Sequence, residues 1–178
     1  MKLVIGITGG SGIIYAKRLL EAVPKDVEVF LVISDLGRKV AAIEGVDLST
    51  YKTIENNDLE AEIASGSFLF DAMVVVPCSM KSLAQIAHGL SDTLIARAAD
   101  VCLKERRPLI LVPRETPYSR VHLTNMLAAH DAGAVIMPAS PPFYTHPATV
   151  NDLVDTVVAR ILDHCKIEHT ISSRWREQ

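Results

Sequence analysis

Glycine and hydroxyl residues follow three apolar runs of this sequence, at the points where the chain turns into an amphipathic stretch. They are the segment 8–12 (TGGSG), Ser34, and the segment 77–82 (PCSMKS). Backbone N–H groups and hydroxyls at the start of a helix bind anions, because the helix dipole is positive there. The carboxyl ends of parallel strands meet at one edge of a sheet, so we expect the three segments to converge on a small anionic ligand.

The glycine-rich turn matches neither of two common nucleotide-binding motifs. Tyr15 stands where the dinucleotide fingerprint needs its third glycine, and no Lys-Ser/Thr pair follows at P-loop spacing. The phosphate of a mononucleotide is compatible with this turn. Three plainer interpretations stay open: a turn that needs only backbone freedom, Ser34 as a simple helix cap before Asp35, and Cys78 as a small buried hydrophobic residue.

Basic residues form a second candidate anion site. Arg97 and Lys104 are seven residues apart in one predicted helix, which places them on the same face. Arg114 follows the next predicted strand, beside Glu115. Together these cations would hold a second phosphate. The alternative is that the basic run 104–107 only stabilises the negative end of a helix dipole.

Several other chemistries find little support in the sequence. The six histidines have no H-x-H or H-E-x-x-H spacing, and there is no Gly-x-Ser-x-Gly nucleophile elbow. No acidic cluster of the kind that holds a diphosphate through magnesium is present. We therefore expect no metal site, and a phosphorylated substrate held by Arg and Lys side chains.

Short apolar runs alternate with amphipathic stretches, which predicts an α/β fold: a three-layer α/β/α, Rossmann-like arrangement with a mostly parallel sheet. Thr149 and Asp152 are placed to cap the last predicted helix. The segment 47–70 shows no clear period and is predicted to be loop-rich. The predicted strands cover residues 3–8, 27–33, 72–76, 109–112 and 134–137, with a short one near Thr53, and the helices cover 12–22, 37–44, 82–88, 92–105, 119–132 and 150–164.

The 178 residues are 49% hydrophobic and carry 18 basic and 21 acidic side chains, which predicts one domain over residues 1–178. The absence of a strongly basic face argues against nucleic-acid binding. Three cysteines without C-x-x-C spacing predict neither a disulfide framework nor a zinc site. Without a signal peptide or a long apolar run, we expect no membrane association and a cytoplasmic location.

Several motifs resemble those of the UbiX/Pad flavin prenyltransferases. They are segments 8–12, 77–82, 97–109 (RAADVCLKERRPL), 112–117 (VPRETP) and 133–139, with Phe143-Tyr144 and Arg174-Trp175. The resemblance covers almost the whole chain, and the two longest runs are the most specific. It implies a metal-independent flavoprotein that joins a dimethylallyl group, from dimethylallyl monophosphate, to N5 and C6 of reduced FMN. The prenylated FMN would serve a UbiD-type decarboxylase, and the family forms homo-oligomers, typically dodecamers, with sites shared between subunits.

The resemblance also implies roles for individual residues. Glu44 and Glu115 correspond to carboxylates of proton transfer, and Ser11 lies close to the flavin N5. Residues that hold the prenyl phosphate are Arg97, Lys104, Tyr144 and Arg160; on the residues alone, Tyr144 is typical of packing and Arg160 of a helix surface. Residues that hold FMN are Gly9, Gly10, Ser11, Ser34, Ser79, Met80, Lys81, Ser82 and Arg114.

One departure from the family concerns the flavin ring. Some members place an aromatic residue over the flavin in the loop before Ala64, and the segment 57–63 of this chain has none. Stacking on the ring would then fall to Leu59 or Ile63. Two alternative functions stay open: an FMN-dependent decarboxylase of cysteinyl peptides, whose expected histidine after the first helix is missing here, and a non-enzymatic FMN carrier.

Overall fold

The computed structural model describes residues 1–172, so Arg174-Trp175 lie outside the described residues. Six strands form one sheet in the order β3-β2-β1-β4-β5-β6, and every neighbouring pair is parallel. This is the strand order of a Rossmann fold. The strands are β1 (Lys2–Ile7), β2 (Glu28–Ile33), β3 (Thr53–Glu55), β4 (Ala72–Cys78), β5 (Leu109–Pro113) and β6 (Val135–Ile136).

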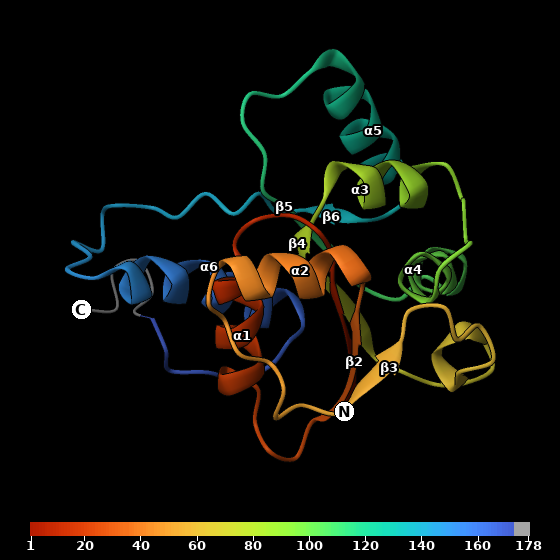
Figure 1. The fold of residues 1–178 in the computed structure, drawn as a ribbon, viewed down its shortest axis with the longest axis horizontal. Helices are drawn as coiled ribbons and strands as arrows, with labels where there is room; N and C mark the ends of the chain where they lie inside the picture. Colours follow the sequence, from red (N-terminus) through yellow and green to blue (C-terminus); the bar gives the residue numbers. More distant parts are fainter. Residues whose placement is uncertain (173–178) are drawn as a thin grey trace.

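Helices cover both faces of the sheet (Figure 1). One face carries α1 (Ile13–Ala22), α2 (Asp35–Ile43) and α6 (Val150–His164). The other carries α3 (Met80–Ala87), α4 (Leu94–Glu105), α5 (Arg120–Asp131) and the short 3-10 helix η1 (Glu62–Ala64). The predicted three-layer α/β/α fold is therefore confirmed.

Successive residues of the central strands bury their side chains on opposite faces. In β1, Leu3 and Ile5 pack with α1 and α6, whereas Val4 packs with α4 and η1. Ile5 lies beside Leu31 of β2 and Val74 of β4, so the same face is apolar across neighbouring strands. A sheet covered on both sides requires apolar residues in succession, which is why the strands show little alternation in the sequence.

The predicted elements are all present, and their first and last residues differ from the predicted ones by at most two positions. Helix α6 occupies the predicted range, because Thr149 and Asp152 form the expected capping box. Helix α2 begins two residues earlier than predicted, at Asp35, because the Ser34 hydroxyl accepts a hydrogen bond from the Gly37 N–H at 3.1 Å. The sheet is parallel throughout, where the prediction allowed for an exception.

The three cysteines are buried and unoxidised. Burial raises the pKa of the Cys78 thiol to about 12, so this side chain is a packed hydrophobic group rather than a nucleophile. Cys102 and Cys165 have pKa values raised to about 12 for the same reason. Over residues 1–172, no helix combines the length and the apolar character needed to cross a membrane.

The cap of α6 gives a direct test of its contribution to folding. Thr149→Ala removes the hydroxyl that accepts the Asp152 N–H, and we expect a loss of about 1 kcal/mol in the free energy of unfolding. Urea titration at pH 7 measures the loss. Thr170→Ala, at an exposed position, is the control and should stay within about 0.5 kcal/mol of the parent. Equal stability of the two variants would contradict the capping role.

Candidate functional site

A cavity of about 230 Å³ lies beyond the carboxyl ends of β1, β2 and β4, and we call it the rim cavity. The strand order reverses between β1 and β4, which is where ligands bind in open parallel sheets. All three predicted anion-binding segments contribute to it. Its lining residues are Thr8, Gly9, Ser34, Asp35, Leu36, Asn56, Ser79, Lys81, Ser82, Gln85, Thr93 and Ile95.

Thr8 joins the ends of β1 and β4 at this cavity. Its hydroxyl donates to the Pro77 carbonyl at 2.9 Å and accepts from the Ser79 N–H at 2.7 Å. The Thr8 N–H also donates to the Pro77 carbonyl, at 3.2 Å. Thr8 is only 2% exposed, and its buried hydroxyl both donates and accepts a hydrogen bond. These bonds fix the two strand ends relative to each other.

The start of α3 supplies a concentrated set of donors. Ser79 accepts a hydrogen bond from the Ser82 N–H at 3.2 Å, and its hydroxyl lies 3.1 Å from that of Ser82. Lys81, an exposed residue, also lines this cavity and carries an ammonium group. A helix start with two hydroxyls and one cation fits a phosphate group. Met80, predicted in the same set, instead packs partly against the core.

Two glycines shape the turn that follows β1. A Cβ on Gly9 would lie 2.7 Å from the Leu36 Cβ, so the backbone can approach α2 at the cavity wall only because Gly9 has no side chain. Gly12 has a φ of 101°, in the left-handed region that favours glycine. Gly10 is buried beside Pro77 and does not line the rim cavity.

The N-terminus of α1 is occupied by a carboxylate of the chain itself. The two oxygens of Glu44 accept hydrogen bonds from the N–H groups of Gly12 and Ile13, each at 2.8 Å. Two of the four unpaired N–H groups at this helix start are therefore satisfied from within the chain. The start of α1 is therefore paired with an internal carboxylate, Glu44, whereas Thr8 and Gly9 of the same turn line the rim cavity beside the starts of α2 and α3.

Glu44 forms a cluster with Ser11 and Arg114. Burial opposes ionisation of Glu44, but hydrogen bonds from the Ser11 hydroxyl and from Gly12 and Ile13, with the charge of Arg114, outweigh it and lower its pKa below the ordinary value. The Arg114 Nε donates to the Ser11 carbonyl at 3.2 Å. Glu44 is therefore a carboxylate at neutral pH.

Glu115 follows Arg114 at the end of β5 and is half-buried. One of its carboxylate oxygens accepts a hydrogen bond from the Thr116 N–H at 2.9 Å. This contact is local, so it fixes the carboxylate beside its own backbone.

The four residues that the resemblance assigns to a prenyl phosphate form two separate pairs. Arg97 and Lys104 lie on α4, whereas Arg160 lies on α6 and Tyr144 in the segment before it. Helices α4 and α6 pack on opposite faces of the sheet and lie on opposite sides of Figure 1. One chain therefore does not bring the four residues together.

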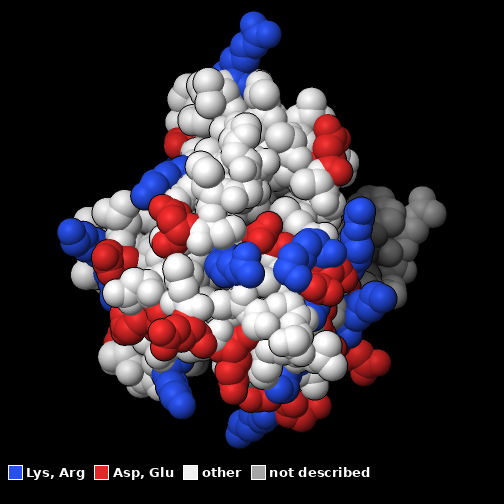
Figure 2. All heavy atoms as spheres, turned by 90° about the vertical axis from the view of Figure 1, so that its right-hand side faces the viewer, with Lys and Arg blue, Asp and Glu red and all other residues white. Residues whose placement is uncertain are grey.

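Arg97 contacts the last residue of η1, and Lys104 contacts its neighbour on α4. The Arg97 Nε donates to the Ala64 carbonyl at 3.0 Å, and the same guanidinium contacts Asp100 at 3.2 Å. Lys104 pairs with Glu105. Figure 2 shows this side of the molecule, where Lys and Arg side chains lie next to Asp and Glu side chains in its lower part. The upper part of the same face is mostly uncharged.

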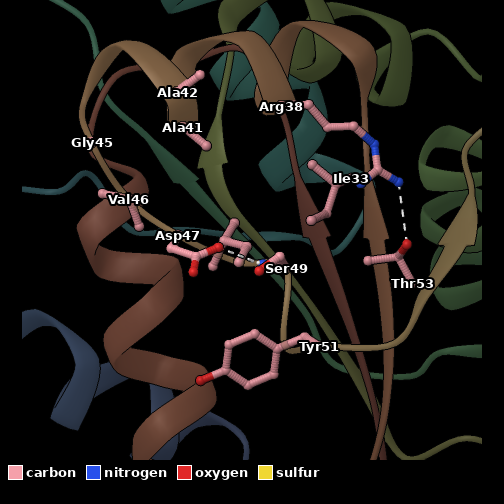
Figure 3. Close-up of a pocket in the computed structure, with 11 residues that line it drawn as sticks. Ile33, Arg38, Ala41, Ala42, Gly45, Val46, Asp47, Ser49, Tyr51 and Thr53 are labelled. Atoms are coloured by element: carbon pink, nitrogen blue, oxygen red, sulfur yellow. Dashed lines mark hydrogen bonds between the residues drawn. The ribbon is translucent and has the colours of Figure 1, made fainter.

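A larger cavity, about 530 Å³, lies elsewhere, between α2, the loop after it and the edge strand β3 (Figure 3). Its polar side chains already bind one another or the backbone. Arg38 donates to the Thr53 hydroxyl at 3.2 Å, and Asp47 accepts from the Ser49 N–H at 2.8 Å. None of the predicted site residues lines this cavity. The rim cavity is therefore the better candidate site, because hydroxyl, ammonium and helix-start donors converge there.

Sequence reasoning overlooked several lining residues of the rim cavity, Asn56 among them, and misjudged another position. Asn56 caps α4, since its side chain accepts from the Ile95 N–H at 3.1 Å and its carbonyl from the Leu94 N–H at 2.8 Å. The Asn-Asn pair in an otherwise polar loop was the only clue to it. Ile63 is fully buried in the core and is wrong as a stacking candidate, whereas Leu59 is 47% exposed.

A family model, related sequences and solved structures all show that this chain is similar to flavoproteins of one kind. The Flavoprotein family model matches residues 1–162. Flavin prenyltransferase UbiX of Methanocaldococcus jannaschii is 48% identical over 98% of this chain and 98% of its own. The structure of AnUbiX (PadA1) in complex with FMN and dimethylallyl pyrophosphate is 41% identical with a TM-score of 0.95, and covers 99% of this chain and 98% of its own. A dodecameric FMN-dependent UbiX-like decarboxylase of Escherichia coli O157:H7 has 44% identity and a TM-score of 0.94, over 99% of this chain and all of its own.

The Glu44 contact predicts a pH-dependent stability difference. Because the folded-state pKa of Glu44 is lowered, its contribution is present above the unfolded-state pKa and is lost as the pH falls through the folded-state value. Glu44→Gln removes one of the two acceptors for the α1 N–H groups, so we expect a loss of about 1 kcal/mol at pH 7 that shrinks towards pH 3. Urea titrations across this range measure it, with Glu60→Gln, an exposed site, as control. A constant difference at every pH would refute the assignment.

Proposed function

Because the chain belongs to the UbiX family of flavin prenyltransferases, we propose that it transfers a dimethylallyl group from dimethylallyl monophosphate to N5 and C6 of reduced FMN. The product would be prenylated FMN for a UbiD-type decarboxylase. The observation that carries this proposal is the rim cavity, which gathers phosphate-type donors at the switch point of a chain related over its full length to enzymes with that name.

The residues of the rim cavity fit the phosphate-bearing part of FMN. Ser79, Lys81 and Ser82 supply hydroxyl and ammonium donors at the positive end of α3, and Ser34 lies at the start of α2. Gly9 keeps the cavity wall free of a side chain. When bound, reduced FMN supplies the nucleophilic ring positions. Gly10, Ser11, Met80 and Arg114 would flank the same ligand from the turns around the cavity.

The prenyl phosphate would be held by cations and a phenol without a metal. An allylic monophosphate departs readily only when its developing negative charge is met by fixed positive charges and proton donors. Arg97, Lys104 and Arg160 supply the charges, and Tyr144 supplies a hydroxyl. In a single chain, the side chains of Arg97, Lys104 and Arg160 are 39%, 45% and 61% exposed, so they are accessible to a ligand or a neighbouring chain.

We propose that this phosphate site is built from two chains of a homo-oligomer, a dodecamer. The position of α4 and α6 on opposite faces of the sheet supports this, because α4 of one chain can meet α6 only in a second copy of the chain. Exposed apolar side chains also favour assembly: Val121, Leu123 and Leu127 on α5 are 65%, 54% and 60% exposed in the single chain.

Glu44 and Glu115 are the proposed proton-transfer groups. The lowered pKa of Glu44 keeps this side chain ionised at neutral pH, so it has no proton of its own and would receive one, through Ser11, from the reacting centre. Glu115 would protonate the departing phosphate or take the proton from C6 of the flavin.

The three free thiols support a reducing compartment such as the cytoplasm.

The direct test is formation of the flavin adduct. The protein is incubated anaerobically with reduced FMN and dimethylallyl monophosphate, and we expect a flavin enlarged by one five-carbon unit by mass spectrometry, with equal yield in EDTA. Tight FMN binding without an adduct would favour the FMN carrier and overturn the proposal. Decarboxylation of a cysteinyl peptide with FMN as oxidant would favour the other alternative.

A second test uses mixed oligomers. Lys104→Ala and Arg160→Ala should each lower the rate of prenyl transfer by about 100-fold while FMN stays bound, because each removes a charge from the departing phosphate. If the site is shared, co-assembly of the two inactive variants restores part of the activity, since some sites then receive an intact α4 and an intact α6. Lys25→Ala, an exposed lysine away from both helices, is the control. Mixed oligomers as inactive as their parents would rule out a shared site.

A further inference from the structure

Three polar side chains lie in succession at the C-terminal end of α6, and the proposed reaction uses only the first of them. The NH1 of Arg160 donates to one oxygen of Asp163 at 2.7 Å, and the Nε2 of His169 lies 3.2 Å from the other oxygen. We propose that Asp163, held by His169, is a positioning residue that orients the Arg160 guanidinium toward the prenyl phosphate. This inference rests on the proposed function and adds a residue to it.

The three side chains become progressively more buried. Arg160 is 61% exposed, Asp163 is 18% exposed and the His169 imidazole is 3% exposed. An exposed ion pair three residues apart on a helix is ordinarily loose and contributes little. Here the carboxylate is fixed from behind by a buried ring, so it cannot change rotamer without breaking a second contact. Arg160 is therefore tied to a rigid group.

The backbone after α6 explains why His169 reaches this position. The Ile167 N–H donates to the Leu162 carbonyl and the Lys166 N–H donates to the Asp163 carbonyl, each at 3.0 Å. With Lys166 at a φ of 57°, these two bonds form a Schellman motif, and the buried Ile167 anchors the turn to the core. The chain reverses there and returns His169 to the last turn of the helix.

A second ion pair on the same helix shows what a purely structural contact looks like. Asp155 of α6 receives both the Nε and the NH2 of Arg18, which ties α6 to α1. Asp163 receives a hydrogen bond from Arg160 through NH1 and belongs to the same helix. A guanidinium has five N–H donors, so one bond through NH1 restrains its position and leaves donors for two phosphate oxygens.

Orientation is the benefit expected from such a contact. A mobile arginine loses conformational entropy when it binds a phosphate, and an arginine held in place loses less. The carboxylate also repels a nearby phosphate, so without a positioning role its removal should strengthen binding. With a positioning role, removal of the carboxylate weakens binding of the phosphate, so the direction of the change separates the two interpretations.

The experiment compares Asp163→Ala with the parent and with Asp155→Ala. The dissociation constant of dimethylallyl monophosphate is measured calorimetrically on the FMN-loaded oligomer, and KM and kcat by adduct formation. We expect Asp163→Ala to raise the dissociation constant and KM about tenfold with FMN retention unchanged. His169→Gln should give a smaller rise. Asp155→Ala should lower the melting temperature without changing either constant.

A double-mutant cycle decides whether Asp163 acts through Arg160. In the Arg160→Ala background, Asp163→Ala should have no further effect on binding. An additive loss, or unchanged or tighter binding in the single variant, would overturn the proposal. If Asp163→Ala does not fold, Asp163→Asn is measured in its place, because it keeps an acceptor oxygen and should raise the constant less. If the parent binds the phosphate ester but forms no adduct, the proposed function fails while the binding cycle still tests the positioning role.

Discussion

A parallel sheet covered on both faces is the constraint on which the proposed chemistry depends. It collects the carboxyl ends of β1, β2 and β4 at one edge, and there the donors of two helix starts line one cavity. The same sheet separates α4 from α6 by its full thickness, because α6 packs against the apolar side chains of one face and α4 against those of the other. Under the proposed function, one chain therefore supplies the donors for the flavin phosphate, whereas the residues proposed for the second phosphate lie on opposite faces of the sheet.

Many polar groups at this edge form hydrogen bonds within the chain, so only the remaining donors are available to a ligand. Thr8 uses its hydroxyl to join two strand ends, and Glu44 occupies the start of α1. The positive end of α1 is thereby already paired with a carboxylate. The donors for an anion lie instead around Ser79, Lys81 and Ser82. Local sequence motifs cannot distinguish these two helix starts, because the carboxylate that fills the first comes from 32 residues further along the chain.

The sequence predicted the fold well because its determinants are local. Apolar runs define the strands, and the Thr149 and Asp152 pair defines the start of α6. Helix starts directly after strands were placed two residues late, since the capping serine is also the first residue after the strand. The site residues were only partly predictable from the sequence pattern. The hydroxyls at the rim could be predicted because they follow strand ends, whereas Tyr144 and Arg160 were predicted only from the family resemblance. An arginine on a helix surface has no pattern of its own, and the contact of Asp163 with His169 depends on a chain reversal that no periodicity predicts.

The proposed active site requires that residues of two chains bind one phosphate. A crystal structure of the assembled protein with FMN and dimethylallyl monophosphate tests this directly. We expect the phosphate to contact Arg97 and Lys104 of one chain and Tyr144 and Arg160 of another. A phosphate bound by the side chains of a single chain, or lying away from both α4 and α6, would contradict it.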